Sequence, residues 1–388
     1  MLSILTVPAA AIGGAVTGTA TASVARGALA QKDESAKEDD AKKKKPDKKE
    51  PFGIHQLTHN THLQELGPVS PNRQSILVIA RKHDTPPNVY VMELSGFYSM
   101  RQITNFRAGA ADPQWSPAGD RIAFDGVDQE AAFAQINIVD LATTQTRRLT
   151  RNNFTNKDPV FTPDGQRLLF TTDESPLPDA AFGILHVGSI AISGAAKGEY
   201  FTEDEASSIL PKIAPDGKSV FLVKVEEQSG RHSLWEYGLD GKPRRDLTSD
   251  RLARIHSYVI NAASGSVVIW GQEQPERQED IYVLDLKTLS LTPLPDPDLP
   301  KRNPALSPDG KLIAFIGPAE QGNFVFLYDS GTGQIQQLSK RGTNSFTPVF
   351  ISNEAILFGS DRDAEQEGDF NEVFIVDLTS PLNPPKKK

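Results

Sequence analysis

The sequence predicts an all-β fold, a seven-bladed β-propeller of four-stranded blades that is closed by pairing of the N-terminal strand with the last blade. A short turn phrase recurs along the chain at the spacing of one blade. Strand-like segments follow each copy in the same order, and no segment has helical periodicity. The segment before the first repeat has no neighbouring strand of its own, and the last repeat lacks a fourth strand, so each supplies what the other lacks. Together these features indicate a closed ring.

The recurring phrase is Ser-Pro or Thr-Pro, then Asp-Gly, then a run of β-branched and aliphatic residues. Its prolines Pro71, Pro117, Pro163 and Pro215 lie 46, 46 and 52 residues apart. The phrase predicts a tight turn, because proline presets φ and glycine accepts the left-handed conformation. The clear and weaker copies predict seven blades, and they begin at Ser70, Ser116, Thr162, Ala214, Ala263, Ser307 and Ile351.

Each repeat predicts four short strands. The first is exemplified by Asp112–Ser116, with the proline placed at the strand entry, where a ladder tolerates it. The second, such as Ile122–Phe124, is apolar on nearly every residue, as expected when neighbouring blades cover both faces. The third is exemplified by Ile136–Leu141, and the fourth ends in a pair such as Leu149-Thr150.

The two ends of the repeat region predict how the ring closes. The last repeat ends after Val373–Leu378 and has no fourth strand of its own. The segment Ile54–Thr58 precedes the first repeat and resembles the fourth-strand segments Arg101–Thr104 and Gln336–Ser339. We therefore expect Ile54–Thr58 to complete the last blade and to remove an open sheet edge.

The repeats resemble the PD40 (WD40-like) blades of the TolB propeller family. The resemblance rests on the Pro-Asp-Gly phrase, the third-strand pattern, the Gln-Leu-Thr ending and Ser360–Asp363, and it covers residues 52–380. It implies the propeller fold and no catalytic residue. In TolB itself the family pattern is an α/β domain followed by six blades, whereas this chain is expected to carry seven. The role of TolB in an envelope complex is therefore not transferred to this chain.

The terminal segments differ in composition from the repeats. Residues 1–30 are small and apolar and end in Ala28-Leu29-Ala30, which predicts a signal peptide, with an uncleaved membrane anchor as the alternative. Residues 31–51 mix charges of both signs and predict a disordered linker, and residues 381–388 predict a disordered basic tail. With the propeller at 52–380, we expect a periplasmic or secreted protein that meets a membrane only through an uncleaved N-terminus.

Composition narrows the classes of partner and chemistry. The net charge is −9, and the three terminal segments are each basic, so the propeller itself is more acidic than the whole chain. Such a body repels nucleic acid and favours a protein, a cell-envelope component, a cationic ligand or a divalent metal. The chain has no cysteine, which excludes disulfides, cysteine-ligated zinc and a cysteine nucleophile. We expect a monomer without a cofactor.

Charged loops predict a partner-binding face at one end of the ring. Acidic loops between second and third strands share that end with basic connections between blades. Ordinary charged, solvated loops are the alternative. The residues predicted to form the face are Arg107, Arg151, Arg254, Arg302, Arg341, Asp361 and Asp363.

Two patterns could hold a metal ion. Acids between Asp361 and Glu372 have the spacing of a calcium loop, although the position that requires glycine is Gln366. The candidate calcium ligands are Asp361, Asp363, Glu365 and Glu372. His55 and His59 would face the same side of a strand, although other blades lack histidines there and solvated side chains explain them as well.

Two functions remain open. We expect an exported, non-catalytic propeller that binds a protein or envelope component through its loop face. The alternative is a propeller-fold enzyme, a carbohydrate lyase or hydrolase, with its site at the channel mouth. An enzyme requires polar side chains from several blades to converge at the channel.

Overall fold

The structure is a computed structural model that describes residues 52–381 apart from 60–61, 83–84, 96–97, 129–130, 176–182, 195–197, 204–205, 320–321, 341–343 and 363–370. The predicted signal peptide, linker and most of the basic tail lie outside the described residues. Every regular element of the described part is a β-strand. Within that part, no helix has the length and apolar character to span a bilayer.

The strands in chain order are β1 (Phe52–Gln56), β2 (Leu63–Val69), β3 (Ser75–Ala80), β4 (Asn88–Glu93), β5 (Met100–Gln102), β6 (Ala110–Trp115), β7 (Arg121–Gly126), β8 (Gln135–Asp140), β9 (Thr146–Arg148), β10 (Asn156–Phe161), β11 (Arg167–Thr172), β12 (His186–Ala191), β13 (Glu199–Tyr200), β14 (Ser207–Ile213), β15 (Ser219–Val225), β16 (His232–Gly238), β17 (Pro243–Asp246), β18 (Arg254–Asn261), β19 (Ser266–Gln272), β20 (Asp280–Asp285), β21 (Leu291–Pro293), β22 (Arg302–Leu306), β23 (Leu312–Ala319), β24 (Gly322–Asp329), β25 (Gln334–Gln337), β26 (Ser345–Phe350), β27 (Ala355–Ser360) and β28 (Glu372–Pro381).

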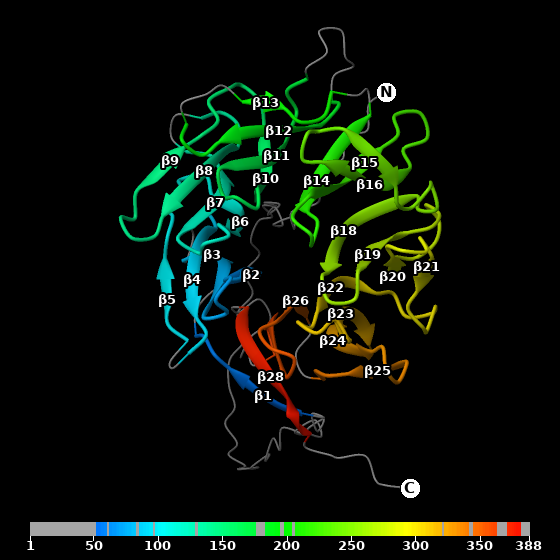
Figure 1. The fold of residues 1–388 in the computed structure, drawn as a ribbon. Helices are drawn as coiled ribbons and strands as arrows, with labels where there is room; N and C mark the ends of the chain where they lie inside the picture. The colour runs from blue at the N-terminus through cyan, green and yellow to red at the C-terminus, as the bar shows by residue number, and fades with distance from the viewer. Residues whose placement is uncertain are drawn as a thin grey trace, which may run out of the picture. The chain divides into compact units, whose positions relative to one another are not determined.

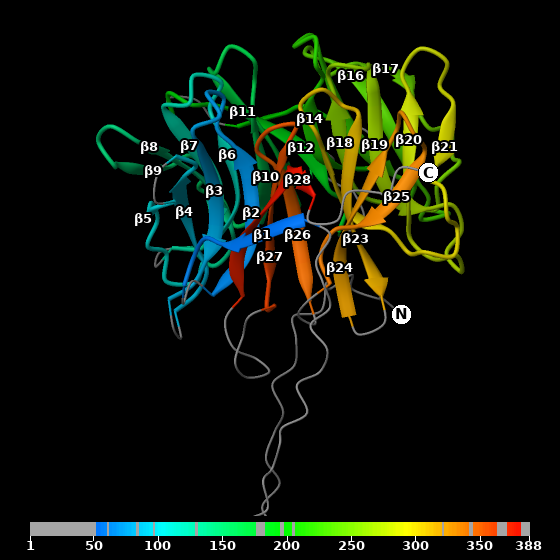
Figure 2. The same cartoon turned by 90° about the horizontal axis from the view of Figure 1, so that it is seen from below.

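These strands form seven four-stranded antiparallel sheets arranged as the blades of a ring (Figure 1). Blade 1 has the order β2-β3-β4-β5, and blades 2 to 6 repeat this order along the chain. The strands β2, β6, β10, β14, β18, β22 and β26 lie nearest the axis. Seen from the side, the strands run between the two faces of the ring (Figure 2). The predicted seven-bladed fold is confirmed.

Apolar side chains between blades hold the ring together. The second strand of each blade is the most buried; β7, for example, is buried at every position from Ile122 to Gly126. Among the described residues, seven apolar clusters each join two neighbouring blades. One of them joins Leu63 and Val78 of blade 1 to Leu357 and Val373 of blade 7, so the ring has no open blade face.

The Pro-Asp-Gly phrase forms the turn between the first and second strands. In blade 3, the Thr162 amide donates to the Arg167 carbonyl oxygen (2.9 Å). The Arg167 amide also donates to the Thr162 hydroxyl (3.0 Å). Gly165 has a φ of 67°, which is the left-handed region that favours glycine. The glycine and, where it is present, the hydroxyl residue therefore both contribute to the turn.

The Leu-Thr ending anchors the outer strand to its neighbour. In blade 2, the Ile136 amide donates to the Thr150 hydroxyl (2.9 Å), and the corresponding bond recurs in blades 1, 3, 4 and 6. The Val373 amide of blade 7 donates in the same way to Thr58 (2.9 Å). Thr58 in turn donates to the buried Glu372 carboxylate (2.5 Å).

The N-terminal strand is the outer strand of blade 7. The sheet order is β1-β28-β27-β26, with Gln56 opposite Phe374. Its Thr58 occupies the place that a chain-contiguous fourth strand supplies in the other blades. This is the arrangement that the complementary ends of the repeat region indicated.

The sequence predicted that the proline of the inner strand lies at the strand entry, and this prediction is wrong. Pro113 is the fourth residue of β6, directly after a β-bulge at Asp112 that shifts the register between Ala111 and Gln114. A bulge leaves its residue outside the regular ladder, so the missing proline amide costs little there. The same bulge before proline recurs at Asp158, Leu210, Asn303 and Thr347, and each bulge residue has a φ between 41° and 53°.

Candidate functional site

The bulges bring carboxyl groups of consecutive blades together on the inner side of the ring. Asp112 and Asp158 are the bulge residues of β6 and β10, and Glu65 holds the corresponding third position of β2. Asp125 joins them from β7, where it is paired with Ala111. Asp112 interacts electrostatically with each of the other three carboxyl groups.

The shared environment raises the pKa values of these acids. Burial, with a smaller contribution from the charge of Asp112, raises the pKa of Glu65 to about 7. The same two causes raise the pKa of Asp158 to about 6. Burial also raises the pKa of Asp125 well above its usual range, and its Oδ1 atom has no hydrogen-bond partner among the described residues. The Glu65 side chain remains accessible to solvent, although the surrounding protein atoms desolvate it.

A lysine of blade 4, which contacts a tyrosine of blade 5, completes this group. The Lys212 ammonium donates to the Tyr258 carbonyl oxygen (2.7 Å) and lies 5.0 Å from the centre of the Tyr258 ring. Burial lowers the pKa of Lys212, while the negative charge of Asp158 acts in the opposite direction. The Tyr258 hydroxyl donates to the carbonyl oxygen of the bulge residue Leu210 (2.7 Å). We call Glu65, Asp112, Asp125, Asp158 and Lys212 the channel cluster.

A cavity of about 440 Å³ adjoins the channel cluster at Lys212, and none of the four acids of the cluster lines it. The inner strands of blades 1 to 5 line it, and Lys212 contributes to its wall. Trp115 and Phe161 provide apolar surface, and the Trp115 indole donates to the Pro68 carbonyl oxygen of the preceding blade (2.9 Å). A cavity of this size with a few polar groups is typical of a small-molecule site.

The arrangement is suited to acid–base chemistry near neutral pH. A carboxyl group with a pKa near 7 is partly protonated there and can donate a proton, while one with a pKa near 6 is mostly ionised and can accept one. Glu65 and Asp158 have these two values. Perturbed carboxyl groups that converge from several chain segments are typical of functional sites.

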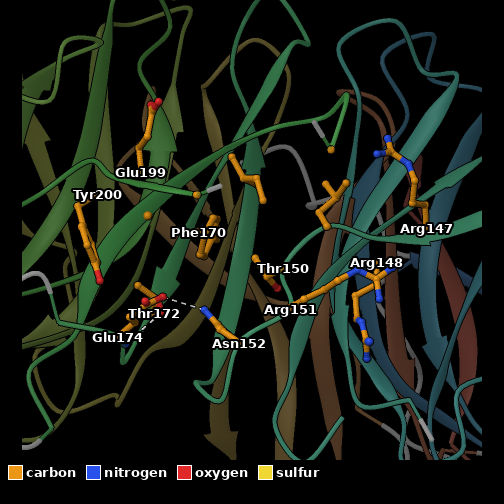
Figure 3. Close-up of a pocket in the computed structure, with 15 residues that line it drawn as sticks. Arg147, Arg148, Thr150, Arg151, Asn152, Phe170, Thr172, Glu174, Glu199 and Tyr200 are labelled. Atoms are coloured by element: carbon orange, nitrogen blue, oxygen red, sulfur yellow. Dashed lines mark hydrogen bonds between the residues drawn. The ribbon is translucent and has the colours of Figure 1, made fainter. Parts of the chain in front are cut away.

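A second cavity, of about 470 Å³, lies between the outer parts of blades 2 and 3 (Figure 3). Arg147 and Arg148 of β9 and Arg151 line one side, and Glu199 and Tyr200 of β13 line the other. This cavity shares no residue with the wall of the channel cavity.

The structure describes five of the seven residues of the predicted partner-binding face. Arg107, Arg151 and Arg254 are exposed, whereas Arg302 is partly buried and donates to the Asn323 side chain. Arg151 lines the cavity between blades 2 and 3, away from the channel cluster. Arg341 and Asp363 lie outside the described residues, so the binding face stays a prediction.

Two of the four candidate calcium ligands, Asp363 and Glu365, also lie outside the described residues. Asp361 accepts from the Asn344 amide (2.9 Å), and Glu372 is buried against Thr58. Within the part of the chain that the structure describes, no group of three or more His, Cys, Asp or Glu side chains could hold a metal ion. His59 instead contacts Gln56, with 3.0 Å between Nδ1 and Nε2.

Sequence analysis missed the channel cluster. The signal was present, because Asp112 and Asp158 stand directly before the inner-strand prolines at equivalent places in successive repeats. Placing those prolines at the strand entry hid the bulge that brings the preceding residues together. Lys212 and Asp125 are not part of this pattern of an acid before a proline, so only their spatial contacts reveal them.

One relative of the chain is named as a peptidase. The chain is 22% identical over 146 residues to the "Uncharacterized peptidase YuxL" of Bacillus subtilis (strain 168), an alignment that covers 29% of this chain and 22% of that protein. The chain thus spans less than a quarter of that relative's length.

Solved structures share the fold at low identity. The oligogalacturonate lyase of Vibrio parahaemolyticus has a TM-score of 0.64 and 17% identity, covering 87% of this chain and 95% of the lyase. A further oligogalacturonate lyase structure, in complex with manganese, has a TM-score of 0.62 and 16% identity, covering 86% and 94%. A puromycin hydrolase mutant has a TM-score of 0.65 and 14% identity, covering 83% of this chain and 53% of the hydrolase.

These comparisons contradict the expectation of a non-catalytic binding module. The relative is named a peptidase, and the similar structures are a lyase and a hydrolase, so they favour the enzyme that the sequence left as the alternative. The sequence-based preference was wrong because residues far apart in the chain cannot be assembled into a site from the sequence, whereas the propeller brings polar groups of separate blades together.

The family is shown by a match to the family model described as "TolB beta propeller domain" (PD40), which covers residues 55–295. The repeat phrases, the seven blades and this match agree, and the chain therefore belongs to the PD40 TolB-like β-propeller family.

Proposed function

We propose that this chain is a propeller-fold enzyme that hydrolyses carbohydrate, with its acid–base groups in the channel cluster. The observation that carries the proposal is the convergence of Glu65, Asp112 and Asp158 from three blades, with two pKa values of about 7 and 6. In this proposal Glu65 donates a proton to the leaving group, and Asp158 accepts a proton from the attacking water. Lys212 acts through Asp158, whose charge it faces.

The charge of the site favours a neutral or cationic substrate. Four carboxyl groups meet there, and the counteracting charges are those of Lys157 and Lys212. An anionic oligosaccharide would be repelled unless its acids were neutralised. The aromatic side chains of Trp115 and Phe161, in the cavity that adjoins Lys212, provide apolar surface for a sugar ring.

The manganese of the similar lyase does not fit the described part of this chain. No group of His, Cys, Asp or Glu side chains there is arranged to hold a metal ion. The proposed reaction therefore assigns every step to side chains of the channel cluster.

The test measures activity of the purified full chain on neutral oligosaccharides and on oligogalacturonate. Release of reducing ends without ultraviolet absorbance from a conjugated double bond would support hydrolysis. Loss of this activity in Glu65→Gln and Asp158→Asn, but not in the surface variant Asp164→Asn, would place it in the channel. Absorbing products from oligogalacturonate would show a lyase and overturn the proposed reaction, and activity that survives both channel substitutions would overturn the site.

We also propose export of the chain to the periplasm or the medium, with residues 1–30 as the signal. The support is the small, apolar composition that ends in Ala28-Leu29-Ala30. Mass spectrometry of the protein from its native host tests this proposal. A mature N-terminus at Gln31 would support cleavage, and an intact Met1 would contradict it.

A further inference from the structure

The cavity between blades 2 and 3 has walls of opposite charge. Arg147, Arg148 and Arg151 come from blade 2 and from the connection that follows it. Glu174 follows β11 of blade 3, and Glu199 belongs to β13. Figure 3 shows the labelled arginines on one side and the two glutamates with Tyr200 on the other.

Ion pairs within the protein neutralise some of these charges, and other charges have no ion-pair partner among the described residues. Arg148 makes an ion pair with Asp128 (3.0 Å), and Glu199 makes one with Arg167 (2.6 Å). Arg151, in contrast, has no hydrogen-bond or ion-pair partner among the described residues.

Glu174 on the opposite wall has no ion-pair partner among the described residues. It accepts a hydrogen bond from the neutral Asn152 amide (2.8 Å) and also interacts with the Tyr200 hydroxyl. Two charges of opposite sign, those of Arg151 and Glu174, are therefore available across the cavity.

The surface between the two walls is largely apolar. Phe170, Leu149 and Ile190 line it, with Gly188 beneath the ring of Phe170. A Cβ atom on Gly188 would lie 2.7 Å from that ring, so glycine is what lets the ring pack there. A volume of about 470 Å³ lies within the range of small-molecule sites.

We propose that this cavity binds a zwitterionic ligand with an apolar body, such as a dipeptide. The carboxylate of the ligand pairs with Arg151, the ammonium group pairs with Glu174, and the apolar side chain lies against Phe170. Arginine is suited to the first contact because its guanidinium group donates two parallel hydrogen bonds to a carboxylate. The site is separate from the channel cluster and does not depend on the proposed hydrolysis.

Isothermal titration calorimetry with the full chain tests this site, using phenylalanyl-glycine and its N-acetylated and C-amidated derivatives. Each derivative removes one charge, and we expect each to bind about tenfold more weakly or worse, because a hydrogen bond to a charged group is lost. Arg151→Gln should weaken the dipeptide about tenfold and abolish the preference for the free carboxylate. Glu174→Gln should abolish the preference for the free ammonium group, because the glutamine side chain is neutral. Its oxygen can still accept the hydrogen bond from Asn152, so the local structure should be retained.

The matched control is Arg101→Gln, which changes an exposed arginine on β5 of blade 1. It should bind like the unmodified protein, and so should the channel variant Asp158→Asn. Thermal unfolding of each variant shows whether the fold is retained. No binding of the dipeptide, equal binding of the acetylated derivative, or unchanged binding by Arg151→Gln would each overturn the proposed site.

Discussion

Replacing Asp158 by asparagine should stabilise the propeller at alkaline pH. The folded protein raises the pKa of this group from 3.8 to about 6. For a carboxyl group whose pKa is higher in the folded state, the contribution to folding stability is fully present below the pKa of the unfolded state. That contribution is lost as the pH rises through the pKa of the folded state. The asparagine amide is neutral at every pH and can still contact Thr171. The variant should therefore gain stability over the unmodified protein between about pH 4 and pH 7.

The size of the effect follows from the pKa difference. A difference of about two pKa units corresponds to about 3 kcal/mol. Water in the channel screens part of this charge, because Asp158 is only partly buried. We expect Asp158→Asn to raise the free energy of unfolding by about 1–3 kcal/mol at pH 8 and to leave it unchanged below pH 4.

Urea unfolding at pH 3.5, 6 and 8 measures this difference. The matched control is Asp164→Asn in the turn of the same blade, where Asp164 accepts from Thr162 (2.6 Å). That hydrogen bond lowers the pKa of Asp164, so its contribution has the opposite sign: it is present above the unfolded pKa and is lost in acid. Asp164→Asn should lose stability at pH 8. Equal or lower stability of Asp158→Asn at pH 8 would refute the reasoning.

Three further predictions concern activity, closure and a turn. If Glu65 is the proton donor, kcat/KM should fall as the pH rises through about 7. Glu65→Gln should lower kcat/KM by about 10²–10⁴-fold. A flat pH profile would contradict this role. Thr58→Val should lower the free energy of unfolding in urea by about 2–3 kcal/mol, because the Val373 amide and the buried Glu372 carboxylate lose their hydrogen-bond partner. Thr58→Ser keeps the hydroxyl and should lower it by less than about 1 kcal/mol. Equal effects of the two variants would contradict this. Gly310→Ala should lower stability by at least about 1 kcal/mol, because its φ is 72°, and an unchanged melting temperature would argue against strain there.

The repeated turns and strand endings could be predicted from the sequence because their causes are local. Proline, glycine and a hydroxyl residue fix the hairpin at Thr162–Gly165 within a few residues. The hydroxyl of Thr150 bonds to the adjacent strand of the same hairpin. Each such unit repeats, so the count of blades follows from the count of phrases.

The position of the inner-strand prolines was harder to predict. The pattern of apolar residues places Pro113 in a strand but does not show the bulge at Asp112 before it. A bulge depends on how two strands align, and the register is visible only once both strands are paired. This is why the acids before the prolines were not recognised as neighbours.

The sequence by itself determined the propeller, because turns, strand periodicity and the unpaired first and last segments are encoded within single repeats. Tertiary structure alone decided the channel cluster: Glu65, Asp158 and Lys212 belong to three different blades and meet only when the ring is closed. The pKa of Asp158 is a property of that meeting, since burial and the charge of Asp112 both arise from the fold. Local chemistry sets the blades, and the closed ring sets the distances between charges on which the proposed acid–base function depends.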